Sequence, residues 1–131
     1  FFVMELPSMK PREQIVLYWL DKCTESELTA GRLSFAINRL YYSLFYAISA
    51  LYAAKGKSYT KHSAIRAAFH RDFVKPGIVK KRIGRLYDEL FNARQQGDYI
   101  PMIEFDIVII IEQVAEVKNV LPKIKKLINE L

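Results

Sequence analysis

Two arginines are the residues of this chain whose type and setting best suit chemistry. Arg39 is the single charged residue in the apolar stretch 33–54. Burying an unpaired guanidinium is costly, so Arg39 must meet an anion, a set of carbonyl oxygens or a polar cleft. Two interpretations stay open. One is a structural ion pair, with Asp98 as the preferred partner, and the other is a cleft arginine that binds phosphate.

Arg94 shares a predicted helical face with Tyr87 and Phe91, which precede it by seven and three residues. Residues 97–99, Gly-Asp-Tyr, come next, and we expect a polar turn there. An arginine at a helix end before such a turn is well placed to bind an anion through two N–H groups. An ion pair that ties this helix to the next one fits the spacing equally well.

The two histidines, His62 and His70, are eight residues apart, so they lie on one side of a helix but two turns from each other. That is not the spacing of metal ligands, and no cysteine or acidic cluster accompanies them, so we predict neither a metal nor another cofactor. His62 shares a face with Ile65 and Phe69, which is more typical of a histidine at the edge of a core than of a catalyst. A Ser-His-Asp or Cys-His set cannot be argued from the spacing.

The net charge of +6 is unevenly distributed. Residues 55–85 hold ten basic residues and one acidic residue, a net charge of +9, so the other hundred residues carry −3. Such a segment attracts phosphates, nucleic acid or an acidic protein, although a solvated lysine-rich face has the same composition. The predicted basic patch consists of Lys55, Lys57, Lys61, Arg66, Lys80, Lys81 and Arg82.

The elements that must position these side chains are nearly all helical. Apolar periodicity and breakers predict an all-α chain with five helices, at residues 8–29, 33–54, 60–74, 79–96, and from Pro101 or Glu104 to the end. Gly97 suits the position just after the fourth helix. Pro122 is expected to kink the last helix or to end its regular part.

Length and composition bound the rest. The chain of 131 residues, 51% hydrophobic and 26% charged, fits a single domain, which we assign to residues 1–131. A single cysteine fits a reducing compartment, and no signal peptide is visible. The apolar run 107–111 is too short to span a bilayer. We therefore expect a cytoplasmic protein without a membrane segment. Three residues precede Met4, and we expect residues 1–7 to be flexible or foreign to the natural chain.

From about residue 13 to the end, an ordered set of motifs resembles the small prokaryotic proteins of the HEPN family (higher eukaryotes and prokaryotes nucleotide-binding). The motifs are Asn38-Arg39-Leu40-Tyr41-Tyr42-Ser43-Leu44-Phe45, Lys55-Gly56, Lys61-His62-Ser63, Phe69, Phe73-Val74-Lys75 and Arg94-Gln95-Gln96-Gly97-Asp98-Tyr99. The resemblance implies an up-and-down bundle of four to five helices. It also implies a homodimer with a polar cleft at or near its interface, and a minimal nucleotidyltransferase partner, often as a toxin and antitoxin pair.

Catalytic members of this family are metal-independent RNases. Their motif is an arginine, usually followed by a polar residue, with a histidine four to six residues after the arginine. Arg94 and Gln95 match the motif, but Tyr99 stands where the histidine is expected. A tyrosine with a pKa of about 10 moves protons poorly near neutral pH. The departure therefore favours phosphate binding over cleavage, with Arg94 and Tyr99 as the catalytic candidates if cleavage survives.

The leading hypothesis is a cytoplasmic HEPN dimer that binds a nucleotide or RNA phosphate and works with a nucleotidyltransferase partner. The predicted phosphate-binding residues are Arg39, Arg94 and Tyr99, supported by Asn38, His62 and Asp98. Two alternatives stay open: a metal-independent RNase toxin, and a non-catalytic module that binds another protein.

Overall fold

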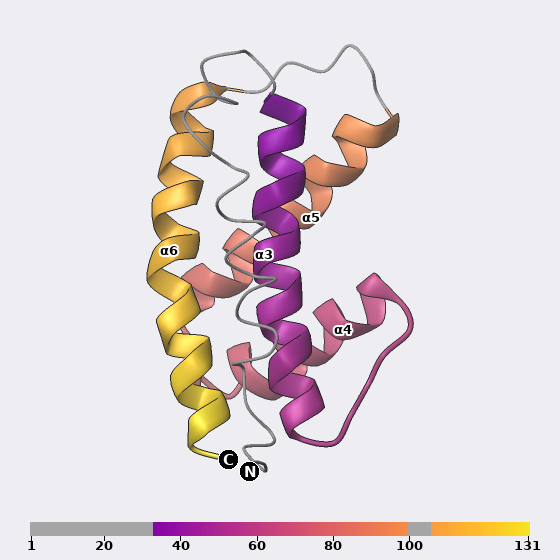
Figure 1. Ribbon diagram of the computed structural model, residues 1–131, viewed down its shortest axis with the longest axis vertical. Coiled ribbons are helices and arrows are strands. Elements are labelled where there is room, and N and C mark those ends of the chain that lie inside the picture. Colours follow the sequence, from indigo (N-terminus) through magenta and orange to yellow (C-terminus); the bar gives the residue numbers. More distant parts are fainter. Residues whose placement is uncertain (1–32, 100–105) are drawn as a thin grey trace, which may run out of the picture.

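The computed structural model of the protein describes residues 33–99 and 106–131, and both ranges are largely helical (Figure 1). The elements are α3 (Leu33–Ala54), α4 (His62–Phe69), the π-helical turn η1 (His70–Val74), α5 (Lys81–Tyr99) and α6 (Ile107–Asn129). No strand occurs within these two ranges, so the predicted all-α fold is confirmed. The helix predicted at 8–29 and the expected extension at 1–7 lie outside the described residues.

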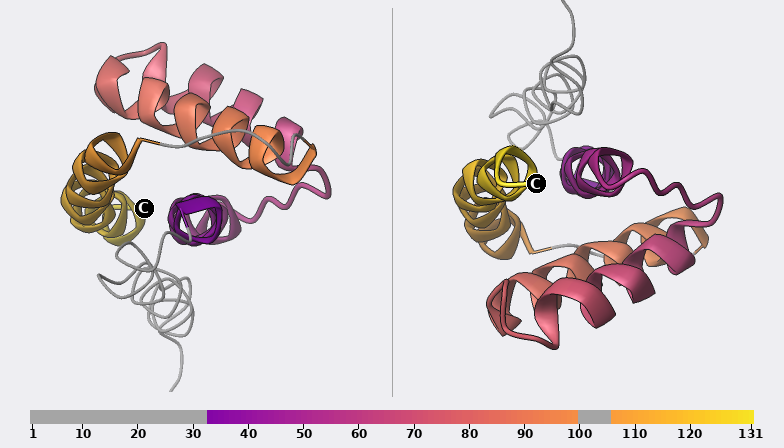
Figure 2. Two further views of the ribbon diagram at one scale, coloured as in Figure 1. Left: turned by 90° about the horizontal axis from the view of Figure 1, so that it is seen from above. Right: turned by 90° about the horizontal axis from the view of Figure 1, so that it is seen from below.

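The described helices form two layers (Figure 2). In one layer α3 and α6 lie side by side and run in the same direction, as Figure 1 also shows. In the other layer α4 and η1 run antiparallel to α5, and this pair crosses over α3 and α6. Helix α3 packs mainly against α6 and α5. Side chains on α3, the start of α4 and the end of α5 are thereby brought to one region.

Helix α3 is the centre of the core, which agrees with its apolar character on nearly every side. Its small residues Ala36, Ser43, Ala47 and Ala50 are all buried, and they let the neighbouring helices approach closely. The Ser43 hydroxyl donates to the Leu40 carbonyl oxygen at 2.8 Å, so its burial leaves no unsatisfied donor. The bounds predicted for this helix, residues 33–54, are those observed.

The buried side chains of the second layer recur at helical spacing: Ile65, Phe69 and Phe73 in one segment and Ile83, Leu86, Tyr87, Leu90 and Phe91 in the other. The last turn of the predicted third helix widens into η1, where the Lys75 N–H donates to the His70 carbonyl oxygen at 2.8 Å. Gly84 of α5 faces this turn so closely that an added Cβ would lie 2.8 Å from His70 Cε1. Any larger residue at position 84 would therefore require the side chains of His70 and Val74, or the helix itself, to shift.

The predicted end of the fourth helix is wrong. Helix α5 continues through Gly97 to Tyr99, so residues 97–99 form its last turn and not a polar turn beyond it. A glycine inside a helix is unfavourable by only about 1 kcal/mol relative to alanine, and the preceding Gln95 and Gln96 are compatible with helix. Gly97 therefore weakens the helix without ending it.

Helix α6 begins later than predicted and is longer than Pro122 suggests. Asp106 is its N-cap, with Oδ1 accepting the Val108 N–H at 2.9 Å. Pro101 and Glu104, the predicted starting points, lie outside the described residues. Pro122 is exposed and does not end the helix, which continues to Asn129. The buried residues Leu121 and Ile124 on either side of it hold the backbone in helical register.

Candidate functional site

A polar pocket of about 370 Å³ lies where α3, α4 and α5 meet. Its lining comes from α3, from the N-terminal end of α4 and from the C-terminal half of α5: Tyr42, Lys61, His62, Ser63, Phe91, Arg94 and Gln95. His62 is the first residue of α4, and its position follows from the antiparallel packing of α4 against α5. We call this the Arg94–His62 pocket. The structure thus brings together two residues that are 32 positions apart in the sequence.

The guanidinium of Arg94 lies over two aromatic rings of α3. Its Cζ atom is 4.9 Å from the ring centre of Tyr41 and 5.3 Å from that of Tyr42. Cation–π contacts of this kind contribute about 0.5–2 kcal/mol and orient the planar group without neutralising it. Arg94 therefore places a positive charge at the wall of the pocket.

The imidazole of His62 is held by aromatic neighbours and one hydrogen bond. It stacks on Phe45, with ring centres 4.1 Å apart and an angle of 18° between the ring planes. Nδ1 lies 2.9 Å from the hydroxyl oxygen of Tyr41. Tyr41 is fully buried, and His62 is the hydrogen-bond partner that the structure gives its hydroxyl. The hydroxyl therefore donates to Nδ1, which leaves the proton of the neutral imidazole on Nε2.

The electrostatic setting agrees with this assignment. Burial, and then the positive charge of Arg94, lowers the pKa of His62 below its ordinary value of 6.5. Burial raises the pKa of Tyr41, an effect that Arg94 partly offsets, so the phenol stays protonated and remains a donor. At neutral pH the site therefore combines a neutral imidazole with a charged guanidinium.

This arrangement is suited to binding an anion. Arg94 supplies charge and a planar set of donors, His62 supplies Nε2–H, and Lys61 and Ser63 are exposed at the rim. The Tyr41 hydrogen bond occupies the Nδ1 lone pair and Nε2 carries the proton, so neutral His62 has no free lone pair with which to act as a general base.

A second polar cluster continues along the same helix pair. Asp88 Oδ1 accepts from Arg66 Nη1 and from His70 Nε2, both at 2.9 Å. The Arg66 guanidinium also lies 4.2 Å from the ring centre of Phe91, a lining residue of the pocket. These contacts fasten α4 to α5 and so fix the distance across the pocket. Sequence reasoning missed Asp88, whose spacing of six residues from Arg94 gives no sign of this role.

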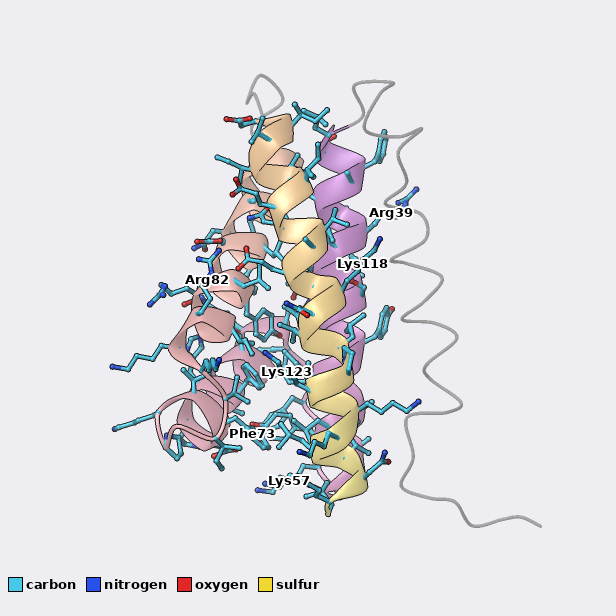
Figure 3. All side chains as sticks on the ribbon, turned by 90° about the vertical axis from the view of Figure 1, so that its left-hand side faces the viewer. Arg39, Lys57, Phe73, Arg82, Lys118 and Lys123 are labelled. Carbon is cyan, nitrogen blue, oxygen red and sulfur yellow. The ribbon has the colours of Figure 1, made fainter. Side chains whose placement is uncertain are left out.

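The remaining predicted site residues are not all in this pocket. Arg39 is half-buried, stacks over Phe35 at 5.9 Å, and projects from the side of α3 turned away from α5 (Figure 3). Asn38 is half-buried one turn before Tyr42, and it is not among the described lining residues. The side chains of Asp98 and Tyr99 lie outside the described residues. Their roles, and the pairing of Arg39 with Asp98, stay predictions.

The basic segment divides between different surfaces. Lys61 lines the Arg94–His62 pocket, and Arg66 lies beside it. Arg82 Nε and Nη2 donate to the Glu116 carboxylate at 2.6 Å, which ties α5 to α6. Lys80 and Lys81 are exposed near the start of α5, roughly 20 Å along the helix axis from Arg94. Part of the predicted patch therefore flanks the pocket, and part lies at the other end of α5.

Residues 33–99 and 106–131 contain no group of three or more His, Cys, Asp or Glu side chains that could hold a metal ion. None of the described helices has both the length and the hydropathy that a membrane span requires.

Residues 22–131 match the model of the HEPN domain. A UPF0332 protein of Thermotoga maritima is 40% identical, covering 94% of this chain and 98% of its own length. A Methanocaldococcus jannaschii protein named "Putative toxin MJ0142" is 36% identical, covering 77% of this chain and 74% of its own length. The chain belongs to the HEPN domain family, as its motifs predict. No solved structure is significantly similar to it.

Proposed function

We propose that this protein binds a nucleotide or RNA phosphate in the Arg94–His62 pocket, and that it acts in the cytoplasm with a minimal nucleotidyltransferase in a toxin–antitoxin-like pair. The observation that carries the binding proposal is the convergence of a guanidinium from α5 and an imidazole N–H from α4 on one pocket. The name of the archaeal relative supports the toxin-like role. The partner is proposed from the family resemblance.

Phosphate fits this donor set. Arginine binds phosphate through two parallel N–H···O contacts, and an imidazole N–H adds a third donor from another direction. Tyr42 and Phe91 supply aromatic surface for a sugar or base attached to that phosphate. A nucleotide therefore matches both the polar and the apolar parts of the lining.

The direct test is a calorimetric titration of AMP and of a short single-stranded RNA into the wild type and into Arg94→Ala. Because charge-assisted hydrogen bonds to a buried group are strong, we expect the substitution to weaken binding by about ten-fold or more. Lys123→Ala, which removes an exposed charge from α6, is the matched control. Equally weak binding by the wild type and by Arg94→Ala that does not respond to salt would refute the proposal.

A metal-independent RNase is the second candidate function, and one observation favours it. His62 places an imidazole beside Arg94, which compensates for the histidine missing at position 99. The Tyr41 hydrogen bond counts against it, because it occupies the Nδ1 lone pair and leaves neutral His62 no free lone pair with which to accept a proton. RNA cleavage in EDTA that is abolished by both Arg94→Ala and His62→Ala would establish this activity. Intact RNA at high protein concentration would exclude it.

The proposed homodimer is supported by an apolar surface at one end of the bundle. Phe35 near the start of α3 and Ile107, Val108, Ile109 and Ile111 at the start of α6 are exposed, and the two helices begin at the same end (Figure 1). A concentration of exposed large apolar side chains at one end of a bundle is typical of a protein interface. A second copy of the chain is the occupant that we propose for this surface.

A further inference from the structure

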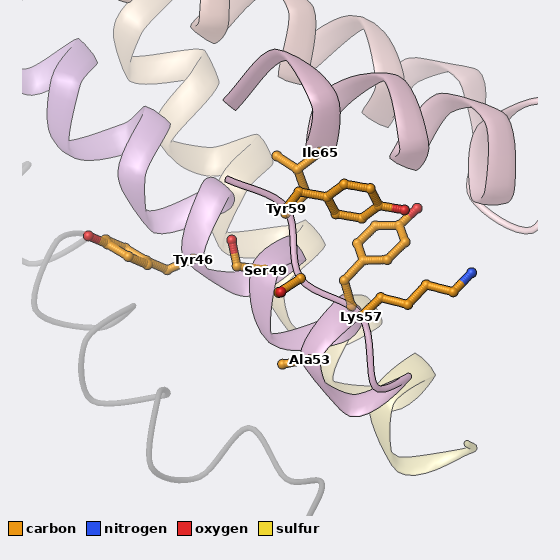
Figure 4. A pocket seen from close by; sticks show the side chains of 8 residues that line it. Tyr46, Ser49, Ala53, Lys57, Tyr59 and Ile65 are labelled. Atoms are coloured by element: carbon orange, nitrogen blue, oxygen red, sulfur yellow. The ribbon is translucent and has the colours of Figure 1, made fainter. Parts of the chain in front are cut away.

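A second pocket lies between the C-terminal half of α3 and the segment 55–61 that follows it (Figure 4). Its volume is about 300 Å³, enough for a small ligand. The lining combines tyrosines, serines, a lysine and two aliphatic residues: Tyr46, Ser49, Tyr52, Ala53, Lys57, Ser58, Tyr59 and Ile65. We call this the tyrosine pocket. Neither the sequence motifs nor the proposed phosphate site accounts for it.

The pocket is a consequence of small residues and a tight turn. Ser49 and Ala53 lie one turn apart on the same side of α3, and their small side chains leave space at the base of the pocket. Gly56 has a φ of 74°, the left-handed conformation that glycine adopts without strain. The chain reverses there, and the Lys57 N–H donates to the Tyr52 carbonyl oxygen at 2.9 Å. The following segment is thereby held against α3 and forms the opposite wall.

The aromatic walls are fixed before any ligand arrives. The rings of Tyr52 and Tyr59 meet edge to face, 5.3 Å apart and at 90°. The Tyr52 hydroxyl donates to Asp72 at 2.9 Å, and Asp72 also accepts from Arg71 Nε at 2.8 Å. The negative charge of Asp72 is therefore balanced locally, while the exposed Lys57 adds positive charge at the opening of the pocket.

The two pockets lie along one stripe of α3. Tyr42 lines the Arg94–His62 pocket, and Tyr46, Ser49 and Ala53 line the tyrosine pocket, at successive spacings of four, three and four residues. The rings of Tyr42 and Tyr46 are 5.8 Å apart. Along the helix axis, Tyr42 and Ser49 are separated by about 10 Å. A ligand of dinucleotide size can therefore occupy both pockets.

We propose that the tyrosine pocket is a subsite for the aromatic base of the nucleotide that adjoins the phosphate bound by Arg94. This inference rests on the proposed function, and it specifies that the ligand is an oligonucleotide and not a mononucleotide. Every base has a π face that the half-buried rings of Tyr46 and Tyr59 can contact, and its edge carries donors and acceptors that the Ser49 and Ser58 hydroxyls can meet. Lys57 lies where it attracts a further phosphate.

The test compares AMP with the dinucleotide ApA by calorimetry, in the wild type and in Ser49→Leu, which fills the pocket floor. We expect ApA to bind about ten-fold more tightly than AMP to the wild type. In Ser49→Leu this ratio should fall close to one, with the affinity for AMP unchanged. Ala53→Leu fills the same floor from the next turn and replaces Ser49→Leu if that variant does not fold. Lys123→Ala is the control for Lys57→Ala, which should weaken the binding of ApApA, which has a second phosphate, more than the binding of ApA.

A ratio near one in the wild type, or a ratio that the filling variants leave unchanged, would overturn the subsite. Failure of the proposed function gives a different result, namely AMP binding that Arg94→Ala does not change. In that case adenosine, which has no phosphate, is titrated in a ¹H–¹⁵N spectrum. Shifts at Ser49 and Tyr59 that disappear in the filling variants would support the subsite independently. Their absence would overturn it.

Discussion

Gly84→Ala tests how α5 is held against α4 and η1, the contact that places Arg94 opposite His62. A Cβ added at Gly84 would lie 2.8 Å from His70 Cε1 and 3.0 Å from Val74 Cγ1. Ordinary contact begins at 3.4 Å, so the neighbouring side chains or the helix itself must move by roughly half an ångström. The same substitution improves helix propensity, so the two effects oppose each other.

The relative size of these two effects decides whether the substitution raises or lowers the free energy of unfolding. Replacing glycine by alanine inside a helix is favourable by about 0.8–1 kcal/mol, and an extra methyl group in a packed contact is unfavourable by about 1–3 kcal/mol. We therefore expect Gly84→Ala to lower the free energy of unfolding by about 1 kcal/mol. For a domain of this size that corresponds to a decrease of about 4 °C in Tm.

Urea denaturation followed by circular dichroism measures this change. The control is the same substitution in the double variant His70→Ala, Val74→Ala, which removes the atoms that the new methyl group would contact. There Gly84→Ala should stabilise the protein, because only the propensity gain remains. A stabilisation of about 1 kcal/mol in the wild-type background would refute the close approach of α5 to η1.

Three further predictions follow from the site and the surface. The pKa of His62 is lower in the folded protein than its ordinary 6.5, so below that pH the unfolded chain binds a proton at His62 that the folded protein does not. The wild type should therefore lose more stability than His62→Gln between about pH 7 and pH 5. Denaturation of both proteins at the two pH values measures the difference. Tyr41→Phe removes the hydrogen bond to His62 Nδ1 and should destabilise the protein by about 1 kcal/mol. In this variant, ¹⁵N NMR should show the proton exchanging between the two His62 nitrogens. An unchanged Nε2–H signal would show that Tyr41 does not set the tautomer. Ile109→Lys should convert the proposed dimer to a monomer in light scattering, whereas Ile78→Lys, at an exposed position in the turn before α5, should not. A mass that neither substitution changes would count against the proposed surface.

Much of the fold is predictable from local patterns. The small residues and tyrosines of 33–54 predict a helix buried all round, and this helix has the predicted bounds. The spacing of Ile65, Phe69 and Phe73 predicts their burial. The errors concern two helix ends. At Gly97 the unfavourable helix propensity of glycine, about 1 kcal/mol, does not end α5, and the N-cap Asp106 starts α6 later than the sequence predicts.

The site is less predictable, because it depends on how two helices cross. Spacing places Arg94 and His62 on separate amphipathic faces, and nothing in it says that the start of α4 lies beside the end of α5. The tautomer of His62 follows from Tyr41, which is 21 residues away. The tyrosine pocket depends on the reversal at Gly56, which the sequence marks only as the turn that closes a helix. The run of aromatic residues at 41–46 contributes one lining residue to each pocket, Tyr42 and Tyr46, and gives no sign of Tyr59.

The central claim is that the Arg94–His62 pocket binds phosphate through a guanidinium and an imidazole N–H. A long-range ¹H–¹⁵N spectrum of the histidine rings, recorded while AMP is added, tests it most directly. We expect an Nε2–H imidazole at His62 in the free protein, whose Nε2 signal moves as AMP binds, and no such movement in Arg94→Ala at the same concentrations. AMP binding that leaves the His62 signals of the wild type unchanged would contradict it.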